Sequence, residues 1–207
     1  DRGHYLVAIK SSGKSRKFNL PDSSECLVEL RSDGTQTMLP PSIHPSGHKL
    51  QFRYINDSAP AVDYADLLVA TQRIAACSVI ARSWSEGSRH QLALAFAGMM
   101  YKADFDQDLT ENVVNTICNF TSDEELDDRL NAVATTYAQD ASSVSGYGIM
   151  VDVLGVNTAR KIAEWLDIGA DNTDVIEADG AVPTILPTTH EDEITEEKMA
   201  EAFTRWA

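Results

Sequence analysis

The chain has 207 residues, of which 43% are hydrophobic, and a formal net charge of −15, so it can bury one core of ordinary size or two small ones. No uninterrupted apolar run reaches the length of about 18 residues that a membrane span needs, and the first residues do not resemble a signal peptide. We therefore expect a cytoplasmic protein without a membrane partner. The three cysteines, Cys26, Cys77 and Cys118, form no C-x-x-C pair, which argues against a disulfide framework or a cysteine-based zinc site.

The charge is distributed unevenly. Residues 1–58 hold eight Lys or Arg and six Asp or Glu, a net of +2, whereas residues 59–207 hold nine and 26, a net of −17. This difference indicates two units. Binding of phosphates depends on cationic side chains, so we expect any contact between the second unit and nucleic acid to be confined to a small part of its surface.

The first unit has the pattern of strands and turns. Residues 5–10, 26–31 and 49–55 alternate between apolar and polar side chains, which predicts three strands. The chain begins almost directly on the first of them, so we expect it to be a fragment of a longer protein. A sheet of this size is too small to be stable on its own.

Two segments connect these strands. Asp33 and Gly34 favour a tight turn after the second strand, so we expect residues 35–39 to return as its hairpin partner. Residues 11–17, SSGKSRK, are small and basic, which is typical of a solvated loop.

The second unit has a helical pattern from about residue 63 to residue 168, which predicts a bundle of five or six helices. We expect the first helix to run from about Asp63 to Trp84 and the second to begin near Ser88. The third is capped by Asp108 or Thr110, and the fourth begins with a capping box from Ser122 to Glu125. A short fifth helix ends at Gly155, and a final one lies between Asn157 and Gly169. Residues 171–197 hold nine acids and no Lys or Arg, which favours a linker. Thr195 then caps a further helix, and we expect the natural chain to continue beyond it.

The predicted fold class is therefore α+β, with a small antiparallel β part followed by an all-α bundle. The predicted units are residues 1–58, residues 59–170 and residues 171–207.

The most specific pattern lies at residues 28–47, VELRSDGTQTMLPPSIHPSG. An acid at the start of [DE]-x-R-x-x-G followed by P-P-S-x-H-P-S-G resembles the plasmid and phage primase-polymerases of the archaeo-eukaryotic primase superfamily. The resemblance implies that residues 1–58 are the C-terminal part of a catalytic domain, that the helices are an accessory domain, and that a helicase domain follows in the parent chain. It also implies nucleoside triphosphates and a single-stranded DNA template as partners.

The same resemblance assigns roles to four residues. Glu29 is implied as a ligand of Mg or Mn and His4 as a contact to the phosphates of the incoming nucleotide, with Arg31 and His44 beside nucleotide or template. Carboxylate-bound metal organises the triphosphate in such reactions. The family's first motif, D-x-D or D-x-E, is missing before His4, so this chain alone is not expected to polymerise.

Plainer interpretations stand beside these roles. The alternative for Glu29 is an acid paired with Arg31 or Arg53 on the surface, and the alternative for His44 is a side chain that orders its proline-rich loop. A zinc site from His4, His44 and His48 matches no recognised ligand spacing.

A second pattern, at residues 81–98, resembles the W-x-x-G-x-R-[NH] entry to the helical domain of the same proteins. Arg89 and His90 at a helix N-terminus suit a phosphate of nucleotide or template. The alternative is an interhelical corner in which Arg89 forms an ion pair. For the whole chain the alternative function is a non-catalytic, acidic interaction module of a replication protein.

Overall fold

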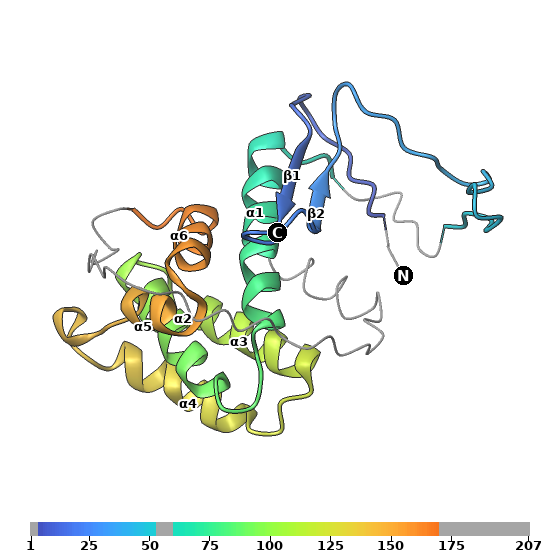
Figure 1. The fold of residues 1–207 in the computed structure, drawn as a ribbon. Coiled ribbons are helices and arrows are strands. Elements are labelled where there is room, and N and C mark those ends of the chain that lie inside the picture. The colour runs from blue at the N-terminus through green and yellow to red at the C-terminus, as the bar shows by residue number, and fades with distance from the viewer. Residues whose placement is uncertain (1–3, 53–59, 170–207) are drawn as a thin grey trace.

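The computed structural model describes residues 4–52 and 60–169. In these ranges the protein is a mixed α+β structure in which helices dominate, with two short antiparallel strands beside the long helix α1 (Figure 1). The predicted α+β class is confirmed at this level. The elements are β1 (Arg16–Asn19), β2 (Cys26–Leu30), α1 (Tyr64–Arg82), α2 (Arg89–Lys102), α3 (Gln107–Thr121), α4 (Leu126–Tyr137), α5 (Tyr147–Leu154) and α6 (Val156–Trp165). The predicted linker at residues 171–197 and the helix after it lie outside the described residues.

The two strands form a hairpin around residues 20–25. Lys17 lies opposite Glu29 and Phe18 opposite Val28. The turn is closed by the Leu20 amide, which donates to the Glu25 carbonyl at 2.8 Å. Phe18 is the side chain of β1 that is buried, and it packs edge-on against Trp165 of α6 with 5.8 Å between ring centroids. One aromatic side chain thus links the sheet to the helical core.

This pairing corrects two sequence predictions. The partner of β2 is β1, whose first two residues belong to the segment predicted as a basic loop, and residues 35–39 form no strand. The predicted turn at Gly34 does form, with φ of 77°, but the chain after it remains exposed. Met38 and Leu39 of this segment are exposed, whereas Phe18 of β1 is buried against Trp165.

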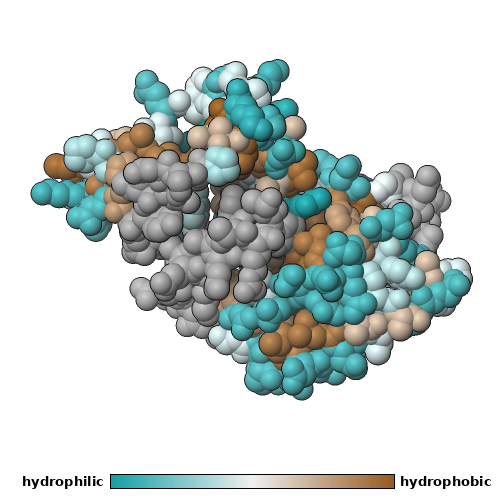
Figure 2. All heavy atoms as spheres, turned by 180° about the vertical axis from the view of Figure 1, so that it is seen from behind, coloured by the Kyte–Doolittle hydropathy of each residue, from teal (hydrophilic) through white to brown (hydrophobic). Residues whose placement is uncertain are grey.

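The other two predicted strands are reduced to isolated pairings within the described residues. Ile9 pairs with Val62 in a parallel bridge, and Ile43 pairs with Lys49. Residues 53–55 of the predicted third strand lie outside the described part of the chain. Several large apolar side chains among residues 4–52 are exposed: Tyr5, Leu6, Val7, Met38, Leu39, Ile43 and Phe52. Figure 2 shows brown side chains among teal ones on the arm that projects to its left, which is the segment extending to the right in Figure 1.

The six helices occur where the sequence predicts them, with shifted boundaries. The cap of α3 lies two residues before the first of the two expected positions and four before the second, because the Asp106 carboxylate accepts a hydrogen bond from the Leu109 amide at 2.7 Å. The predicted capping box is wrong: Ser122 instead ends α3 in a left-handed conformation, with φ of 54°. Asn157 lies within the first turn of α6 rather than capping it, and Gly155, with φ of 82°, separates α5 from α6.

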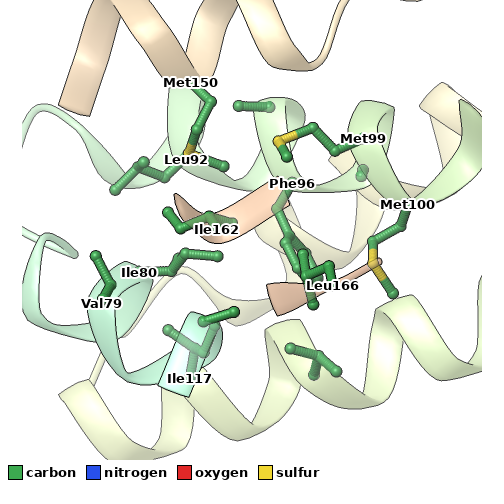
Figure 3. Close-up of a cluster of buried hydrophobic side chains, with 14 of the residues drawn as sticks. Val79, Ile80, Leu92, Phe96, Met99, Met100, Ile117, Met150, Ile162 and Leu166 are labelled. Atoms are coloured by element: carbon green, nitrogen blue, oxygen red, sulfur yellow. The ribbon is translucent and has the colours of Figure 1, made fainter. Parts of the chain in front are cut away.

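Phe96 of α2 lies at the centre of the helical core (Figure 3). The alanines on either side of it, Ala93, Ala95 and Ala97, are fully buried, so they let neighbouring helices approach α2 on more than one side. The surrounding side chains come from α1, α2, α3, α5, α6 and the residue after α6: Val79, Ile80, Leu92, Met99, Met100, Ile117, Met150, Ile162 and Leu166.

One contact in this core is between backbones. A Cβ atom placed on Gly146 would lie 2.3 Å from the Met99 nitrogen, and one placed on Gly98 would lie 2.8 Å from the Ser145 carbonyl oxygen. The start of α5 therefore rests directly on α2, and only glycine fits at both positions.

Within the described ranges, α1 is the helix whose length and hydropathy would suffice to cross a membrane. It has 19 residues, and 33% of its apolar window is buried inside the protein. The sequence prediction that the chain has no membrane span stays a prediction, and Asp66 and Arg73 interrupt the apolar run of this helix. Its buried positions, among them Ala75, Ala76 and Ile80, pack in the helical core, and core helices of globular proteins satisfy the same criterion.

Candidate functional site

Strand β2 presents Glu29 between two cations. The Arg31 Nε donates to one carboxylate oxygen at 2.9 Å, and the Lys17 ammonium lies 3.6 Å from the other. The Glu29 side chain is 20% exposed. Partial burial alone would raise the pKa of Glu29, but the hydrogen bonds and charges of Arg31 and Lys17 outweigh it and hold the pKa below its ordinary value. Glu29 is therefore ionised at neutral pH, as a metal ligand or ion-pair partner must be.

Glu29 supplies one carboxylate only. In residues 4–52 and 60–169 no three His, Cys, Asp or Glu side chains are grouped so that they could hold a metal ion. Mg²⁺ is bound through one or two carboxylates together with water and substrate phosphates. Glu29 thus fits as one ligand of such an ion, and the described residues do not complete the set. The grouping of His4, His44 and His48 around zinc does not occur either.

The two histidines predicted near Glu29 have different surroundings. His4 is exposed at the start of the described chain. His44 Nδ1 lies 2.7 Å from the Ser46 hydroxyl and accepts a hydrogen bond from the Ser46 amide at 3.2 Å. The backbone of the same loop is closed by the His44 amide, which donates to the His48 carbonyl at 2.8 Å. His44 therefore orders its own loop, as the plainer interpretation of this residue expects.

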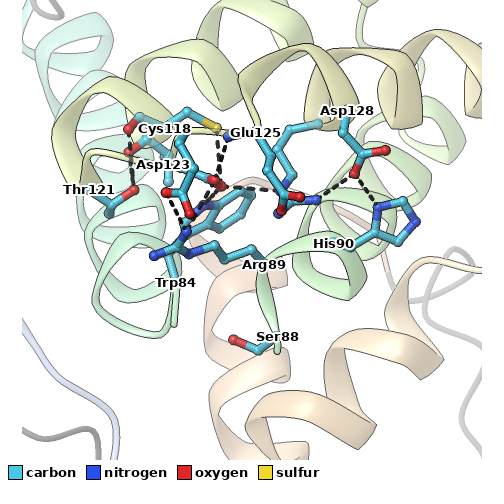
Figure 4. A network of polar contacts seen from close by, with 12 residues as sticks. Trp84, Ser88, Arg89, His90, Cys118, Thr121, Asp123, Glu125 and Asp128 are labelled. Carbon is cyan, nitrogen blue, oxygen red and sulfur yellow. Dashed lines mark hydrogen bonds and ion pairs between the residues drawn. The ribbon is translucent and has the colours of Figure 1, made fainter. Parts of the chain in front are cut away.

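The corner between α1 and α2 holds a network of polar contacts (Figure 4). At its centre is the Asp123 carboxylate, which lies in the α3–α4 connection and is fully buried. It accepts hydrogen bonds from the Trp84 indole at 2.8 Å, from Arg129 Nε at 3.1 Å and from Arg89 at 3.2 Å. The Glu125 amide donates to it at 3.1 Å. One carboxylate thus joins the end of α1, the start of α2 and the first turn of α4.

The electrostatics of this corner follow from these contacts. Burial alone would raise the pKa of Asp123, but the hydrogen bonds from Trp84, the Glu125 amide and Arg129 together hold it below its ordinary value. The same burial, with the nearby Asp123 charge, raises the pKa of the Cys118 thiol to about 11. Cys118 is therefore a neutral core side chain.

The predicted phosphate contacts lie at the rim of this network. Arg89 is shared between Asp123 and the exposed Glu124, each at 3.2 Å, and its Nε is buried without a hydrogen-bond partner. His90 Nδ1 lies 2.9 Å from the Asp128 carboxylate, with both side chains half exposed. The Ser88 hydroxyl bonds to the carbonyls of Ser83 and Ser85. This is the geometry of an interhelical corner, in which an anion would have to compete with Asp123 for Arg89.

Sequence reasoning missed the two residues that organise the corner, Asp123 and Arg129. Arg129 is 5% exposed and also bonds Glu125 at 2.6 Å and Asp128 at 2.5 Å. The spacing of Glu125 and Arg129, four residues apart, was a local signal for an ion pair. Trp84, 39 residues from Asp123 in sequence, gave no local signal.

Comparison of the chain with protein-family models, with curated proteins and with solved structures found no match. By its fold and contacts the chain is a helix-dominated α+β protein. Glu29 is paired with two cations on its small sheet, and the Asp123 carboxylate is buried at the corner between α1 and α2.

Proposed function

We propose that the chain is part of a replication primase-polymerase that synthesises primers on a DNA template by metal-dependent nucleotidyl transfer. The observation that carries this proposal is the position of Glu29, an ionised and partly exposed carboxylate between two cations, on the strand that precedes the P-P-S-x-H-P-S-G loop. A carboxylate for a metal ion and cations for phosphates are the groups that phosphoryl transfer needs side by side.

In this proposal Glu29 is one ligand of a bound Mg or Mn ion, which supplies charge neutralisation for the triphosphate and the leaving pyrophosphate. Arg31 and Lys17 leave Glu29 and contact phosphate oxygens, and His4 reaches the same phosphates from the start of the chain. The remaining acid ligands come from a D-x-D or D-x-E strand in the parent protein. The helical bundle assists nucleotide and template binding through His90 and Arg89, and a helicase domain of the same parent chain is the further partner.

The test uses the natural full-length protein in a primer-synthesis assay on single-stranded DNA with Mg or Mn. Glu29→Ala and the nearly isosteric Glu29→Gln are both expected to abolish synthesis. Glu25→Gln is the matched control, because Glu25 is an exposed acid at the same hairpin whose carboxylate pairs with Arg82 of α1 at 2.7 Å. Synthesis that persists in Glu29→Gln at the level of the control would remove Glu29 from the metal site.

A second candidate function is a non-catalytic, acidic interaction module of a replication protein. It is favoured by the corner, where Asp123 and Glu124 balance Arg89 and Asp128 faces His90. Fluorescence anisotropy of this chain with labelled ATP and labelled single-stranded DNA separates the two candidates. Binding that falls in His90→Ala supports nucleotide or template binding by the bundle, and no binding of either ligand supports the protein module. His90→Ala is chosen over Arg89→Ala because it leaves the Asp123 network in place.

A further inference from the structure

A groove of about 680 Å³ lies where β1 meets α1 and α6. This volume falls within the range of about 300–1,000 Å³ that is usual for small-molecule sites. The side chains that matter for its chemistry come from three elements: Arg16, Phe18, Gln72, Asn157, Lys161 and Trp165. None of them was predicted as a site residue from the sequence, because they come from segments far apart in the chain.

The wall formed by β1 carries an available cation. Residues two apart on a strand share a face, so Arg16 lies on the same side of β1 as the buried Phe18. Lys17 also lines the groove but is paired with Glu29. Within the described residues the Arg16 side chain has no hydrogen-bond or ion-pair partner. Its guanidinium is free to bind an oxyanion with two parallel hydrogen bonds.

The opposite wall, formed by α6, carries a second cation. The Lys161 ammonium lies 5.7 Å from the centroid of the Trp165 ring and within 3.0 Å of the Glu164 carboxylate, one turn away. Ion pairs between exposed side chains on one helix contribute little, so an anion in the groove can draw Lys161 away from Glu164. Gln72 of α1 and Asn157 of α6 add amide N–H donors.

The groove is also unusual in its charge. Residues 59–207 carry a net −17, so an anionic ligand is repelled by most of that surface, whereas the groove lining holds Arg16, Lys17 and Lys161 against Asp22 and Glu164. We propose that this groove binds a phosphate group, with Arg16 and Lys161 as the cationic contacts on opposite walls. The choice of phosphate among oxyanions, and of a nucleotide or a DNA strand as its source, rests on the proposed function.

The burial of the two aromatic rings determines what is recognised. Phe18 is 7% exposed and Trp165 is 5% exposed, so neither ring has a free face on which a base can stack. The site is therefore expected to recognise the phosphate group and to show little preference among bases.

The test is a titration of the 15N-labelled, 207-residue chain, followed by NMR, with dAMP, inorganic phosphate and an oligodeoxythymidylate strand as separate probes. We expect shifts of the Trp165 indole N–H and of the Gln72 and Asn157 side-chain amides. Arg16→Gln and Lys161→Gln should each weaken binding by about tenfold or more, because each removes a charge-assisted hydrogen bond. The control is Arg160→Gln, which removes the same charge from the neighbouring, exposed position of α6.

Tighter binding of the strand than of dAMP would identify a strand backbone as the phosphate source, and the reverse would identify a free nucleotide. No shift at these signals, or equal weakening by Arg160→Gln and Arg16→Gln, would overturn the proposal. Both groove substitutions are at side chains that are not buried, so the variants retain the fold, which the dispersion of the same spectra reports. If phosphate binds in the groove and Glu29→Gln leaves primer synthesis unchanged, only the proposed metal site is refuted. If no probe shifts the groove signals, only the proposed phosphate site is refuted.

Discussion

Replacement of Asp123 by asparagine is the sharpest test of how the corner is held together. The substitution keeps the size of the side chain and removes its charge, so that an amide N–H₂ replaces one of the two oxygens that now face Trp84, Arg129 and Arg89. Each carboxylate oxygen accepts hydrogen bonds from two N–H donors, so replacing one oxygen leaves two donors without an acceptor. Arg89 and Arg129 also lose their buried counter-charge.

The expected cost follows from the contacts that remain. Breaking a buried ion pair by removing one partner costs about 3–5 kcal/mol. Arg129 keeps Glu125 and Asp128 as partners after the substitution, so we expect the free energy of unfolding to fall by about 3 kcal/mol, the lower end of that range. Glu124→Gln is the control: its side chain is 77% exposed, and the loss of such a pair costs under about 1 kcal/mol.

The assay is urea unfolding followed by far-UV circular dichroism, at neutral pH and in acid. The pKa of Asp123 is lowered in the folded protein, so its charge stabilises the fold above the pKa of the unfolded chain, and this contribution is lost as the pH falls through the folded pKa. The difference between wild type and Asp123→Asn should therefore shrink below about pH 4. A variant within about 1 kcal/mol of wild type at neutral pH would refute the role given to Asp123.

Three further predictions concern packing and reactivity. Gly146→Ala should lower the free energy of unfolding by about 3 kcal/mol or more in the same assay, because its Cβ would lie 2.3 Å from backbone; Gly148→Ala, whose Cβ meets its nearest atom at 3.5 Å, should be neutral or stabilising, and equal effects would contradict the backbone contact. Phe18→Ala should cost about 3 kcal/mol and change the fluorescence of the Trp165 indole that it touches; an unaltered emission spectrum would mean that the strands are not docked on α6. Cys118, with a pKa of about 11, should react with iodoacetamide at pH 8 about 100-fold more slowly than in unfolded protein, as measured by peptide mass spectrometry, and fast labelling in the folded state would contradict its burial.

The helices were predictable because their signals are local. The apolar positions of residues 107–121 and 156–165 recur with helical spacing, and Gly155 marks the end of α5. The boundaries failed where two local signals competed. Ser122 has the residue type of an N-cap for α4, but in the structure it ends α3 in a left-handed conformation. The neighbouring sequence does not distinguish an N-cap of α4 from a C-cap of α3.

The strands were poorly predicted because a strand needs a partner. The strand at residues 16–19 is held by the contact of Phe18 with Trp165, a residue 147 positions later in the chain. Asp123 was missed for the same reason, since its partners Trp84 and Arg89 lie 39 and 34 residues away. A site formed by residues far apart in the sequence cannot be predicted from the spacing of neighbouring residues.

The contact between Gly98 and Gly146 sets where the chain tolerates a change in length. Residues 141–143 are exposed and connect α4 to α5 without packing, so a foreign peptide inserted there has room to leave the surface. Three residues further on, the backbone of Gly146 lies against that of α2, and one added residue would move the start of α5 off its support. Related chains should therefore vary in length before Ser145 and keep a constant spacing from Ser145 to Gly155.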